Sequence, residues 1–439
     1  MVMEMSYIYK GFRRYVGWML KKTIFKSFNS MGLENVPAPG TPVLVVENHQ
    51  NGICDPLGLV VSLQDRKTLV FSRADIFNKN KFMSRILTSF GLLPAYRMDH
   101  EGLDQVSENY VSFDRAEHLL LNGETVAIYP EGKHQGKRIL GEFSSAYMRI
   151  AFEAAKASNF QQEIWILPAC NHYSDYYGLR NQAMINYGVP IALSQWYDQY
   201  KEKPRTTCNQ VNRLVRSKIE EMMLNIQDDA HYDNINFLCN TMNHYRHPMM
   251  KNCLPALLEA DKGLCNQISQ MNDDARNELM DNTTNLREIE QAWNIQDESV
   301  EQNYNKRTII NGSIVAILLL PLWLVCLWPG IITWQICRAI IKKGTDPIFG
   351  SALLLSLGGV ILMPILSIAT TIVMGIYINW WVALGWLLLI PLLTRFAWNY
   401  YKKVSMLIDS IRVMKMRRST EYEKMQTLRN KIKLTIEEL

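Results

Sequence analysis

Asn48, His49 and Asp55 form the segment of this sequence that is best suited to chemistry. An alcohol is a weak nucleophile near neutral pH, and an imidazole can act as the base that takes its proton. A carboxylate bonded to the other ring nitrogen fixes the tautomer and stabilises the imidazolium. The segment therefore predicts base catalysis on a hydroxyl substrate. Two structural alternatives stay open: Asp55 before Pro56 suits a helix N-cap, and His49 could serve the fold alone.

Two further segments carry groups suited to holding a phosphate. Residues 129–132 end a predicted strand in a turn, and His134, Lys137 and Arg138 follow it. Glycine in such a turn permits close approach of the backbone to a ligand. Residues 91–97 end in an arginine, which can grip a phosphate through two hydrogen bonds. Taken alone, each segment also fits an ordinary surface turn or a surface arginine.

Together these segments resemble the glycerolipid acyltransferase family, which includes the PlsC-like glycerol-3-phosphate and 1-acylglycerol-3-phosphate acyltransferases. The family has four ordered blocks: N-H-x-x-x-x-D, G-x-x-x-x-x-R, F-P-E-G, and a proline after an apolar strand. These blocks are carried here by Asn48, His49 and Asp55; by Gly91 and Arg97; by Tyr129, Pro130, Glu131 and Gly132; and by Pro168. Their order and spacing agree with the family over about residues 30–220, roughly half the chain.

The resemblance implies a role for each block. His49 is expected to be the base and Asp55 to orient it, while Arg97, Glu131 and Gly132 hold the glycerol phosphate. The implied reaction moves a fatty acyl chain from acyl-CoA or acyl-carrier protein to glycerol-3-phosphate or its 1-acyl form, a step of phospholipid biosynthesis. Neither a metal nor a cofactor is expected. Two alternatives stay open: a different lipid acceptor, such as a lysophospholipid or aminolipid, and a non-catalytic membrane scaffold that retains the fold.

Three departures from the family pattern bear on this expectation. Five residues separate His49 from Asp55, where most members have four, and Gly52 is expected to absorb the extra residue in a turn. A branch resembling fungal glycerol-3-phosphate acyltransferases shares the longer spacing, which favours glycerol-3-phosphate as the acceptor. Tyr129 replaces the usual Phe, and residues 144–146 replace a basic-glycine pair.

Cys54, next to Asp55, raises the separate hypothesis of a covalent acyl-cysteine. A reactive thiolate needs both access and a lowered pKa. We expect a small buried residue instead.

The pattern of apolar residues indicates which elements position these groups. Short apolar runs predict strands at 42–46, 68–72, 125–129 and 164–169, and helical spacing predicts helices at 85–93, 106–121 and 144–157. Strands that alternate with helices favour an α/β fold with a mainly parallel sheet flanked by helices. A helical connector and a C-terminal α-helical membrane region are expected to follow this domain.

The flanking regions have different characters. Residues 4–28 carry apolar side chains at helical spacing with Lys and Arg between them, which favours an interfacial membrane helix over a surface helix packed on the core. Residues 195–305 are polar and helical in pattern. The predicted domains are 1–29, an amphipathic interfacial helix; 30–220, the acyltransferase α/β domain; 221–305, a helical subdomain or connector; 306–401, transmembrane helical hairpins; and 402–439, a basic cytoplasmic helical tail.

Residues 308–337 and 347–394 contain no charged side chain. About 20 apolar residues suffice for one helix to cross a bilayer. The first stretch contains Trp328-Pro329-Gly330 and the second is divided at residues 377–381, so two helical hairpins are expected. The first hairpin could be re-entrant, and a single tilted crossing is the alternative for it.

Charge placement favours one orientation and one kind of partner. The formal net charge is +5, and basic residues lie before, between and after the two apolar stretches. The positive-inside rule then predicts an integral membrane protein with its catalytic domain on the cytoplasmic face. Anionic lipid headgroups are the expected partners, and no motif indicates nucleic acid. Eight scattered cysteines without a C-x-x-C pair favour a reducing compartment, and charges within the first apolar runs argue against a signal peptide.

Overall fold

The computed structural model describes residues 6–73, 81–95, 109–134, 136–176, 180–302, 304–342 and 354–439. The chain divides into two compact units, one of residues 1–223 with 345–356 and one of residues 224–344 with 357–439. The first unit is built on a β-sheet. In the second, the described residues form helices and loops.

The sheet has eight strands in the order β1-β7-β6-β2-β5-β3-β4, with β8 paired to β6. Their bounds are β1 (Ser27–Met31), β2 (Val43–Glu47), β3 (Thr68–Arg73), β4 (Leu92–Ala95), β5 (Thr125–Ile128), β6 (Trp165–Tyr173), β7 (Gln182–Tyr187) and β8 (Ile191–Ala192). All pairings are parallel except those of β6 with β7 and β8. This arrangement confirms the predicted α/β class with a mainly parallel sheet.

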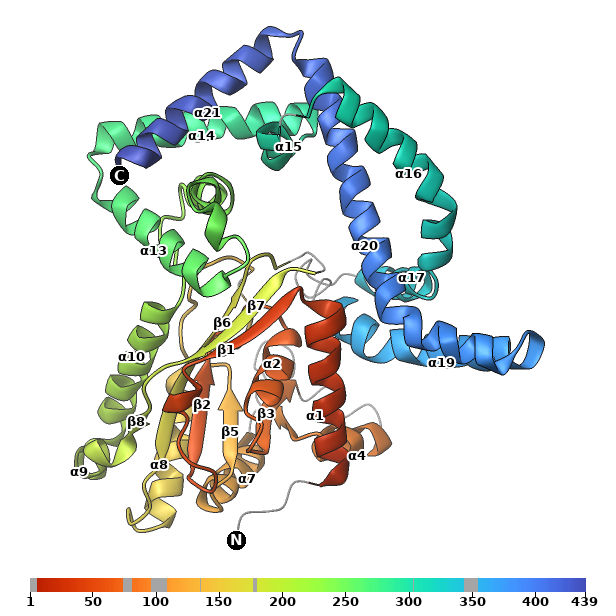
Figure 1. The fold of residues 1–439 in the computed structure, drawn as a ribbon. Helices are drawn as coiled ribbons and strands as arrows, with labels where there is room; N and C mark the ends of the chain where they lie inside the picture. The colour runs from red at the N-terminus through yellow and green to blue at the C-terminus, as the bar shows by residue number, and fades with distance from the viewer. Residues whose placement is uncertain are drawn as a thin grey trace. The chain divides into compact units, whose positions relative to one another are not determined.

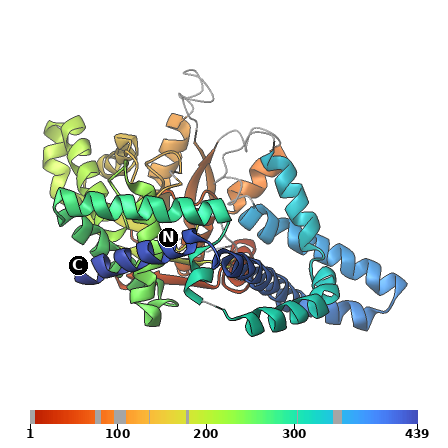
Figure 2. The same cartoon turned by 90° about the horizontal axis from the view of Figure 1, so that it is seen from above.

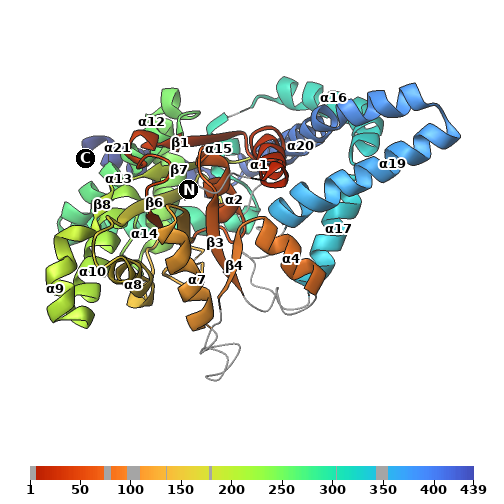
Figure 3. The same cartoon turned by 90° about the horizontal axis from the view of Figure 1, so that it is seen from below.

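Helices cover both faces of the sheet (Figures 1 and 3). One face packs against α1 (Tyr7–Met19) and α2 (Cys54–Ser62), and the other against α7 (Asn109–Leu121), α8 (Met148–Ala157) and α10 (Pro204–Met222). Because both faces are covered, the central strand β2 is apolar at four successive positions and wholly buried. The unit also contains α4 (Lys81–Ser89), η1 (Leu20–Ile24), η2 (Leu33–Asn35), η3 (Ser145–Tyr147), η4 (Leu193–Trp196) and α9 (Tyr197–Glu202).

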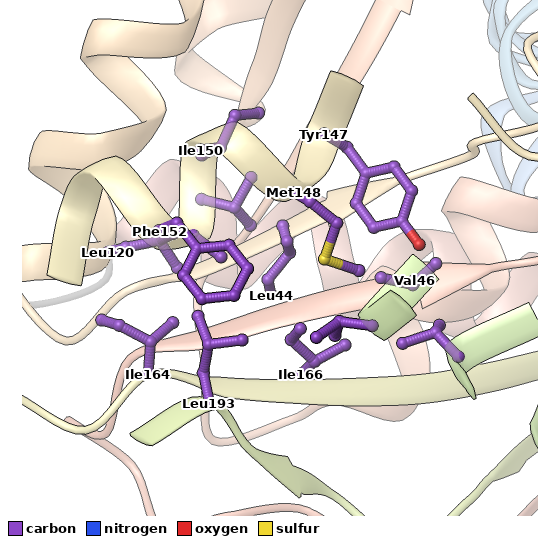
Figure 4. Packing of buried hydrophobic residues seen from close by; sticks show 14 of the residues in the cluster. Leu44, Val46, Leu120, Tyr147, Met148, Ile150, Phe152, Ile164, Ile166 and Leu193 are labelled. Atoms are coloured by element: carbon purple, nitrogen blue, oxygen red, sulfur yellow. The ribbon is translucent and has the colours of Figure 1, made fainter. Parts of the chain in front are cut away.

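Alternation along β2 divides its side chains between two cores. Leu44 and Val46 pack with Phe152 and Ile166 in one cluster, which Figure 4 shows at close range. Val43 and Val45 lie in the opposite cluster, on the side of α1 and α2. Glu47, the last residue of β2, is two positions after Val45, so its side chain lies on the same face of the sheet as those of Val43 and Val45. The sheet therefore holds the start of the Asn48-His49 loop between two apolar layers.

The predicted helix over 85–93 is wrong at its C-terminal end. Helix α4 ends at Ser89, and Leu92–Ala95 form β4, parallel to β3 at the edge of the sheet. Gly91 has φ +84, and a Cβ there would lie 2.7 Å from the Thr68 carbonyl oxygen, so glycine permits the turn into β4. Pro94 is tolerated because an edge strand leaves one side unpaired. In the helix predicted over 106–121, residues 106–108 lie outside the described residues, and α7 begins at Asn109.

The predicted N-terminal helix is shorter than expected. It ends in η1, and residues 27–31 form strand β1 beside β7, so residues 25–28 are not helical. Tyr9 and Val16 on α1 are buried, whereas Tyr7, Ile8 and Trp18 are exposed. The helix thus packs one face on the α/β unit and leaves a second face with aromatic side chains exposed.

The second unit begins with the region predicted to be a helical connector. Its elements are α11 (Tyr232–Leu238), η5 (Cys239–Asn243), α12 (His244–Arg246), η6 (Pro248–Met250), α13 (Leu254–Gln270), α14 (Asp273–Trp293) and α15 (Asp297–Gln302). The C-terminal helix α21 (Thr420–Glu438) lies along α14 (Figure 2). Arg429 on α21 is buried and donates from Nε to Asp297 Oδ1 at 2.7 Å. This ion pair joins the end of the chain to α15.

The apolar stretches form helices with breaks where the sequence predicts them. The helices are α16 (Lys306–Cys326), α17 (Gly330–Ile341), η7 (Leu354–Leu362), α19 (Met363–Tyr377) and α20 (Trp380–Met416). Within the described residues, three helical stretches are long and apolar enough to cross a bilayer: Lys306–Cys326, Leu357–Tyr377 and Trp380–Met416. Helix α17 has 12 residues, fewer than a crossing needs. The number of crossings stays a prediction.

Candidate active site

His49 and Asp55 form a hydrogen-bonded pair at the carboxyl end of β2. His49 lies in the loop after the strand, and Asp55 lies in the first turn of α2. The distance from His49 Nδ1 to Asp55 Oδ2 is 2.8 Å. The Asp55 side chain is fully buried, while 19% of the His49 side chain is exposed. With Nδ1 occupied by the carboxylate, Nε2 is the ring nitrogen left to meet a substrate.

The Asp55 carboxylate is fixed by three further donors. Its Oδ2 accepts the backbone N–H groups of Gln50 and Asn51 at 2.8 and 2.9 Å, and its Oδ1 accepts the Tyr173 hydroxyl at 2.6 Å. Donors of this kind stabilise the ionised form of a buried carboxyl group and hold its orientation. Gly52 has φ +45 and lies in the turn that precedes α2, which is the turn expected there; that this turn absorbs the extra residue between His49 and Asp55 stays a prediction.

Asn48 anchors the loop to the neighbouring strand. Its Oδ1 accepts the Asn171 backbone N–H at 2.7 Å, and its Nδ2 donates to the Asn171 carbonyl at 3.2 Å. Asn48 is fully buried. Beyond the end of β2, the Asn48 side-chain amide thus makes the two hydrogen bonds to the β6 backbone that a further strand residue would have made. The position of His49 is therefore set by β6 as well as by β2.

Glu131 holds His49 through the backbone. Its Oε1 accepts the His49 N–H at 2.7 Å, and its Oε2 accepts the Gly141 N–H at 2.8 Å. The side chain is buried and belongs to the turn after β5, in which the Gly132 N–H donates to the Tyr129 carbonyl at 3.1 Å. Gly132 has φ +67, the left-handed region that favours glycine. Glu131 thus links the loop that carries His49 to the backbone at Gly141.

Two aromatic rings flank the His49 imidazole. The Tyr129 ring lies 4.6 Å from it between centroids, tilted by 33°, and the His134 ring lies 5.8 Å away, nearly perpendicular. Both come from the segment after β5. They limit the positions the imidazole can adopt, and His134 brings a second titratable ring next to the first.

The basic residues predicted to hold phosphate are placed differently from one another. Arg138 is only 3% exposed, and its Nη2 donates to the Ser174 carbonyl, beyond the end of β6, at 3.4 Å. Lys137 is exposed. Arg97 lies outside the described residues. Pro168, the fourth block, is an interior residue of β6 paired beside Val46, where it has a structural position in the sheet.

Cys54 is buried next to Asp55, as expected of a structural cysteine. Burial, and secondarily the Asp55 carboxylate, raises the pKa of the Cys54 thiol. A thiol that is both inaccessible and harder to ionise does not suit nucleophilic catalysis.

Sequence patterns missed three residues of this site. Asn171 and Tyr173 lie at the end of β6, and Glu47 is the last residue of β2. Glu47 breaks an otherwise apolar buried strand immediately before the histidine block, and that interruption is the signal that could have identified it. Tyr173 gave no such signal because its partner Asp55 is 118 residues away in the chain.

Comparisons with known proteins agree with the resemblance. Residues 27–172 match the family model described as Acyltransferase. Glycerol-3-phosphate O-acyltransferase 2 of Saccharomyces cerevisiae is 25% identical over 220 residues, which is 49% of this chain and 28% of that protein. The match thus spans less than a third of that relative's length. The resemblance to PlsC-like glycerolipid acyltransferases is confirmed for this region.

A solved structure also aligns with part of the chain. It is the crystal structure of the 1-acyl-sn-glycerophosphate (LPA) acyltransferase PlsC from Thermotoga maritima, with 15% sequence identity. The alignment covers 48% of this chain and 79% of that one, with a TM-score of 0.32.

Proposed function

We propose that this chain is a membrane-bound O-acyltransferase, since residues 27–172 match the acyltransferase family and enclose a paired histidine and aspartate. The donor is a fatty acyl thioester of coenzyme A or acyl-carrier protein. The acceptor is glycerol-3-phosphate or 1-acylglycerol-3-phosphate. The single observation that carries the proposal is the 2.8 Å contact of His49 Nδ1 with a fully buried Asp55, which leaves Nε2 on a partly exposed ring.

The proposed reaction proceeds by direct transfer. His49 Nε2 takes the proton of the acceptor hydroxyl while the hydroxyl oxygen attacks the thioester carbonyl carbon. The carbon–sulfur bond then breaks, and the proton passes from the imidazolium to the departing thiolate. Asp55 holds the tautomer with Nδ1 protonated and stabilises the imidazolium between these two steps. The products are the acylated acceptor and the free thiol.

For the acceptor phosphate we propose Arg97, Arg138 and Lys137 as the cationic contacts. Arginine suits this role because its planar group can donate two parallel hydrogen bonds to a phosphate. Glu131 was predicted to bind substrate, but a carboxylate repels phosphate, and both its oxygens accept backbone N–H groups of the protein. We therefore propose that Glu131 positions His49, and that Gly132 contributes only the turn.

For the membrane we propose that the apolar helices of the second unit span it and that the catalytic domain faces the cytoplasm. Support comes from the three helical stretches of sufficient length and apolarity and from the basic residues that flank them. The exposed face of α1 carries Tyr7, Ile8 and Trp18 and is followed by exposed Lys21 and Lys22. Aromatic and basic side chains together suit the interface with anionic lipids.

The function is tested with the purified full chain in detergent or lipid vesicles, using labelled acyl-CoA and acyl-carrier protein. We expect labelled lipid with glycerol-3-phosphate or its 1-acyl form as the acceptor. Lysophospholipids and aminolipids are the comparison acceptors, and a preference for one of them would replace the proposed substrate. Lipid binding without transfer from either donor would establish the non-catalytic scaffold instead.

Glu131→Gln tests the positioning role. The amide keeps one acceptor oxygen and loses the other, so one of the two backbone N–H groups is left facing a donor. A lost hydrogen bond to a charged group costs about 1.5–3 kcal/mol, and we expect kcat to fall about tenfold or more. The KM for the phosphate acceptor should change little. A raised acceptor KM at unchanged kcat would instead assign Glu131 to substrate binding.

A further inference from the structure

Glu47 is a carboxyl group buried in the middle of the sheet. It ends the central strand β2, has no exposed surface, and directly precedes the Asn48-His49 pair. Burial of an ionised carboxylate without a compensating cation costs several kcal/mol, so such groups usually keep their proton. The role of Glu47 in the site therefore depends on what surrounds it.

The strand register gives Glu47 its neighbours. Val46 pairs with Ile128, so the next residues along the two parallel strands are Glu47 and Tyr129. On the other side Glu47 pairs with Ala169, and Ala169 pairs with Tyr187. Because Ala169 is small, the carboxyl group has a tyrosine on each side within one row of the sheet.

The two tyrosine hydroxyl groups differ in their partners. The Tyr187 hydroxyl is hydrogen-bonded to the Ser62 hydroxyl on α2. The Tyr129 hydroxyl and both Glu47 carboxyl oxygens are buried neighbours, and within the described residues neither group has a well-formed hydrogen bond to another partner; the Asn171 side-chain NH₂ group lies beside Glu47 in the same situation. The Tyr129 ring, which carries this hydroxyl, lies 4.6 Å from the His49 imidazole between centroids. Tyr129 thus reaches from the buried carboxyl group to the proposed base.

The charges around Glu47 disfavour its ionised form. Its titratable neighbours are Asp55, Tyr129, Tyr173 and Tyr187. Burial first, and then the negative charge of Asp55, raises the pKa of Glu47 well above its ordinary value. Burial likewise raises the pKa of each of the three tyrosines, so their hydroxyl groups keep their protons.

We propose that Glu47 is a positioning residue, a neutral acid that pairs with the Tyr129 hydroxyl and so holds the Tyr129 ring against His49. This inference rests on the proposed acyltransferase function for its catalytic consequence. With Glu47 neutral, Asp55 is the carboxylate that contacts the His49 ring. An ionised Glu47 would place a second negative charge next to the buried Asp55 carboxylate.

Glu47→Gln tests the protonation state without any activity measurement. A carboxyl group whose pKa is raised in the folded protein binds its proton more tightly there, so its contribution to stability falls as pH rises above about 4.5. Glutamine has a similar shape and no such dependence. We expect the variant to melt at a higher temperature than the wild type near pH 8, by a margin that shrinks toward about pH 5. A difference in melting temperature that is the same at pH 5 and pH 8, or that changes sign, would overturn the proposal that Glu47 is neutral.

A double-mutant cycle of Glu47→Leu and Tyr129→Phe tests the pairing. Each single change leaves one buried polar group facing an apolar one, whereas the double change removes both. We expect each single variant to lower kcat about tenfold at unchanged KM, and the double variant to lose much less than the product of the two. Glu47→Gln should restore the kcat that Glu47→Leu loses.

Tyr187→Phe is the matched control, because it removes a hydroxyl on the other side of Glu47 that is bound to Ser62. Combined with Glu47→Leu, its effect on kcat should be additive. Additivity in the Tyr129 cycle as well would overturn the pairing. If Glu47→Leu does not fold, Glu47→Gln and Tyr129→Phe still decide the proposal by melting and kcat. If the wild type transfers no acyl chain, the proposed function fails, and coupling in melting temperature alone decides whether the pair exists.

Discussion

His49→Ala is expected to lower acyl transfer about 100-fold or more while the protein stays folded. Without the imidazole, no positioned base takes the acceptor proton, and general base catalysis typically contributes factors of about 10²–10⁴. His49 is partly exposed, so its truncation leaves little buried volume unfilled. The measurement is the initial rate with labelled donor and purified full chain, together with a melting curve.

The second unit contains a matched control for this variant. His231 Nδ1 lies 3.0 Å from Asp228 Oδ2, a histidine–aspartate pair of similar geometry. His231→Ala should leave the transfer rate within about twofold of wild type, because the pair has no part in the proposed reaction. Full activity in His49→Ala would reject the proposed mechanism. Equal losses in both variants would indicate a general effect of removing such pairs.

Asp55→Asn is expected to damage both catalysis and folding. The carboxylate accepts hydrogen bonds from His49, Gln50, Asn51 and Tyr173, and an amide has one acceptor oxygen in place of two. Its NH₂ group must then face a donor in a fully buried position. We expect transfer to fall about 100-fold or more. The free energy of unfolding should fall by about 3 kcal/mol, a typical cost of breaking a buried polar network.

The two effects of Asp55→Asn are separated by comparing it with Tyr173→Phe. That variant removes the donor to Oδ1 but leaves the His49 contact and the two backbone donors to Oδ2. It should lower stability with a smaller loss of kcat. An Asp55→Asn variant that folds normally and transfers at the wild-type rate would remove Asp55 from the mechanism.

The histidine–aspartate pair could be predicted because it is local. His49 and Asp55 lie on one loop, and a strand before them and a helix after them are both visible in the pattern of apolar residues. The turn at Gly52 followed from the one-residue excess in spacing. Where a strand is buried on both faces, as β2 is, its sequence is a short apolar run, and such runs identified β2, β3, β5 and the first half of β6.

The remaining strands escaped prediction because their stability comes from distant partners. Strand β1 is polar at three of its five positions and is held by β7, which lies 155 positions later in the register. Strand β4 contains Pro94 and is stable only as the edge partner of β3. The alternation of apolar residues and the strand propensity of each residue reflect only local sequence. Pairing between strands that are far apart in the chain therefore leaves no pattern in either strand alone.

Side-chain roles in the site were harder to predict than side-chain identities. Glu131 belongs to a recognisable block, yet its two backbone partners, His49 and Gly141, become visible only when the loops are placed together. Glu47 is the opposite case. It belongs to none of the family's sequence blocks, and only its complete burial in the structure indicates a role. A buried polar group is informative only after its surroundings are known.

Strand β6 also dictates when the site can be assembled during protein synthesis. Asn171 and Tyr173, near its end, supply the partners of Asn48 and Asp55, which leave the ribosome more than a hundred residues earlier. A nascent chain that stops short of β6 already contains His49, Asp55 and Glu131 but lacks the groups that complete their network. The site is therefore complete only after β6 has been synthesised, and a fragment cut before residue 165 would contain the His49–Asp55 segment without the partners that fix its geometry.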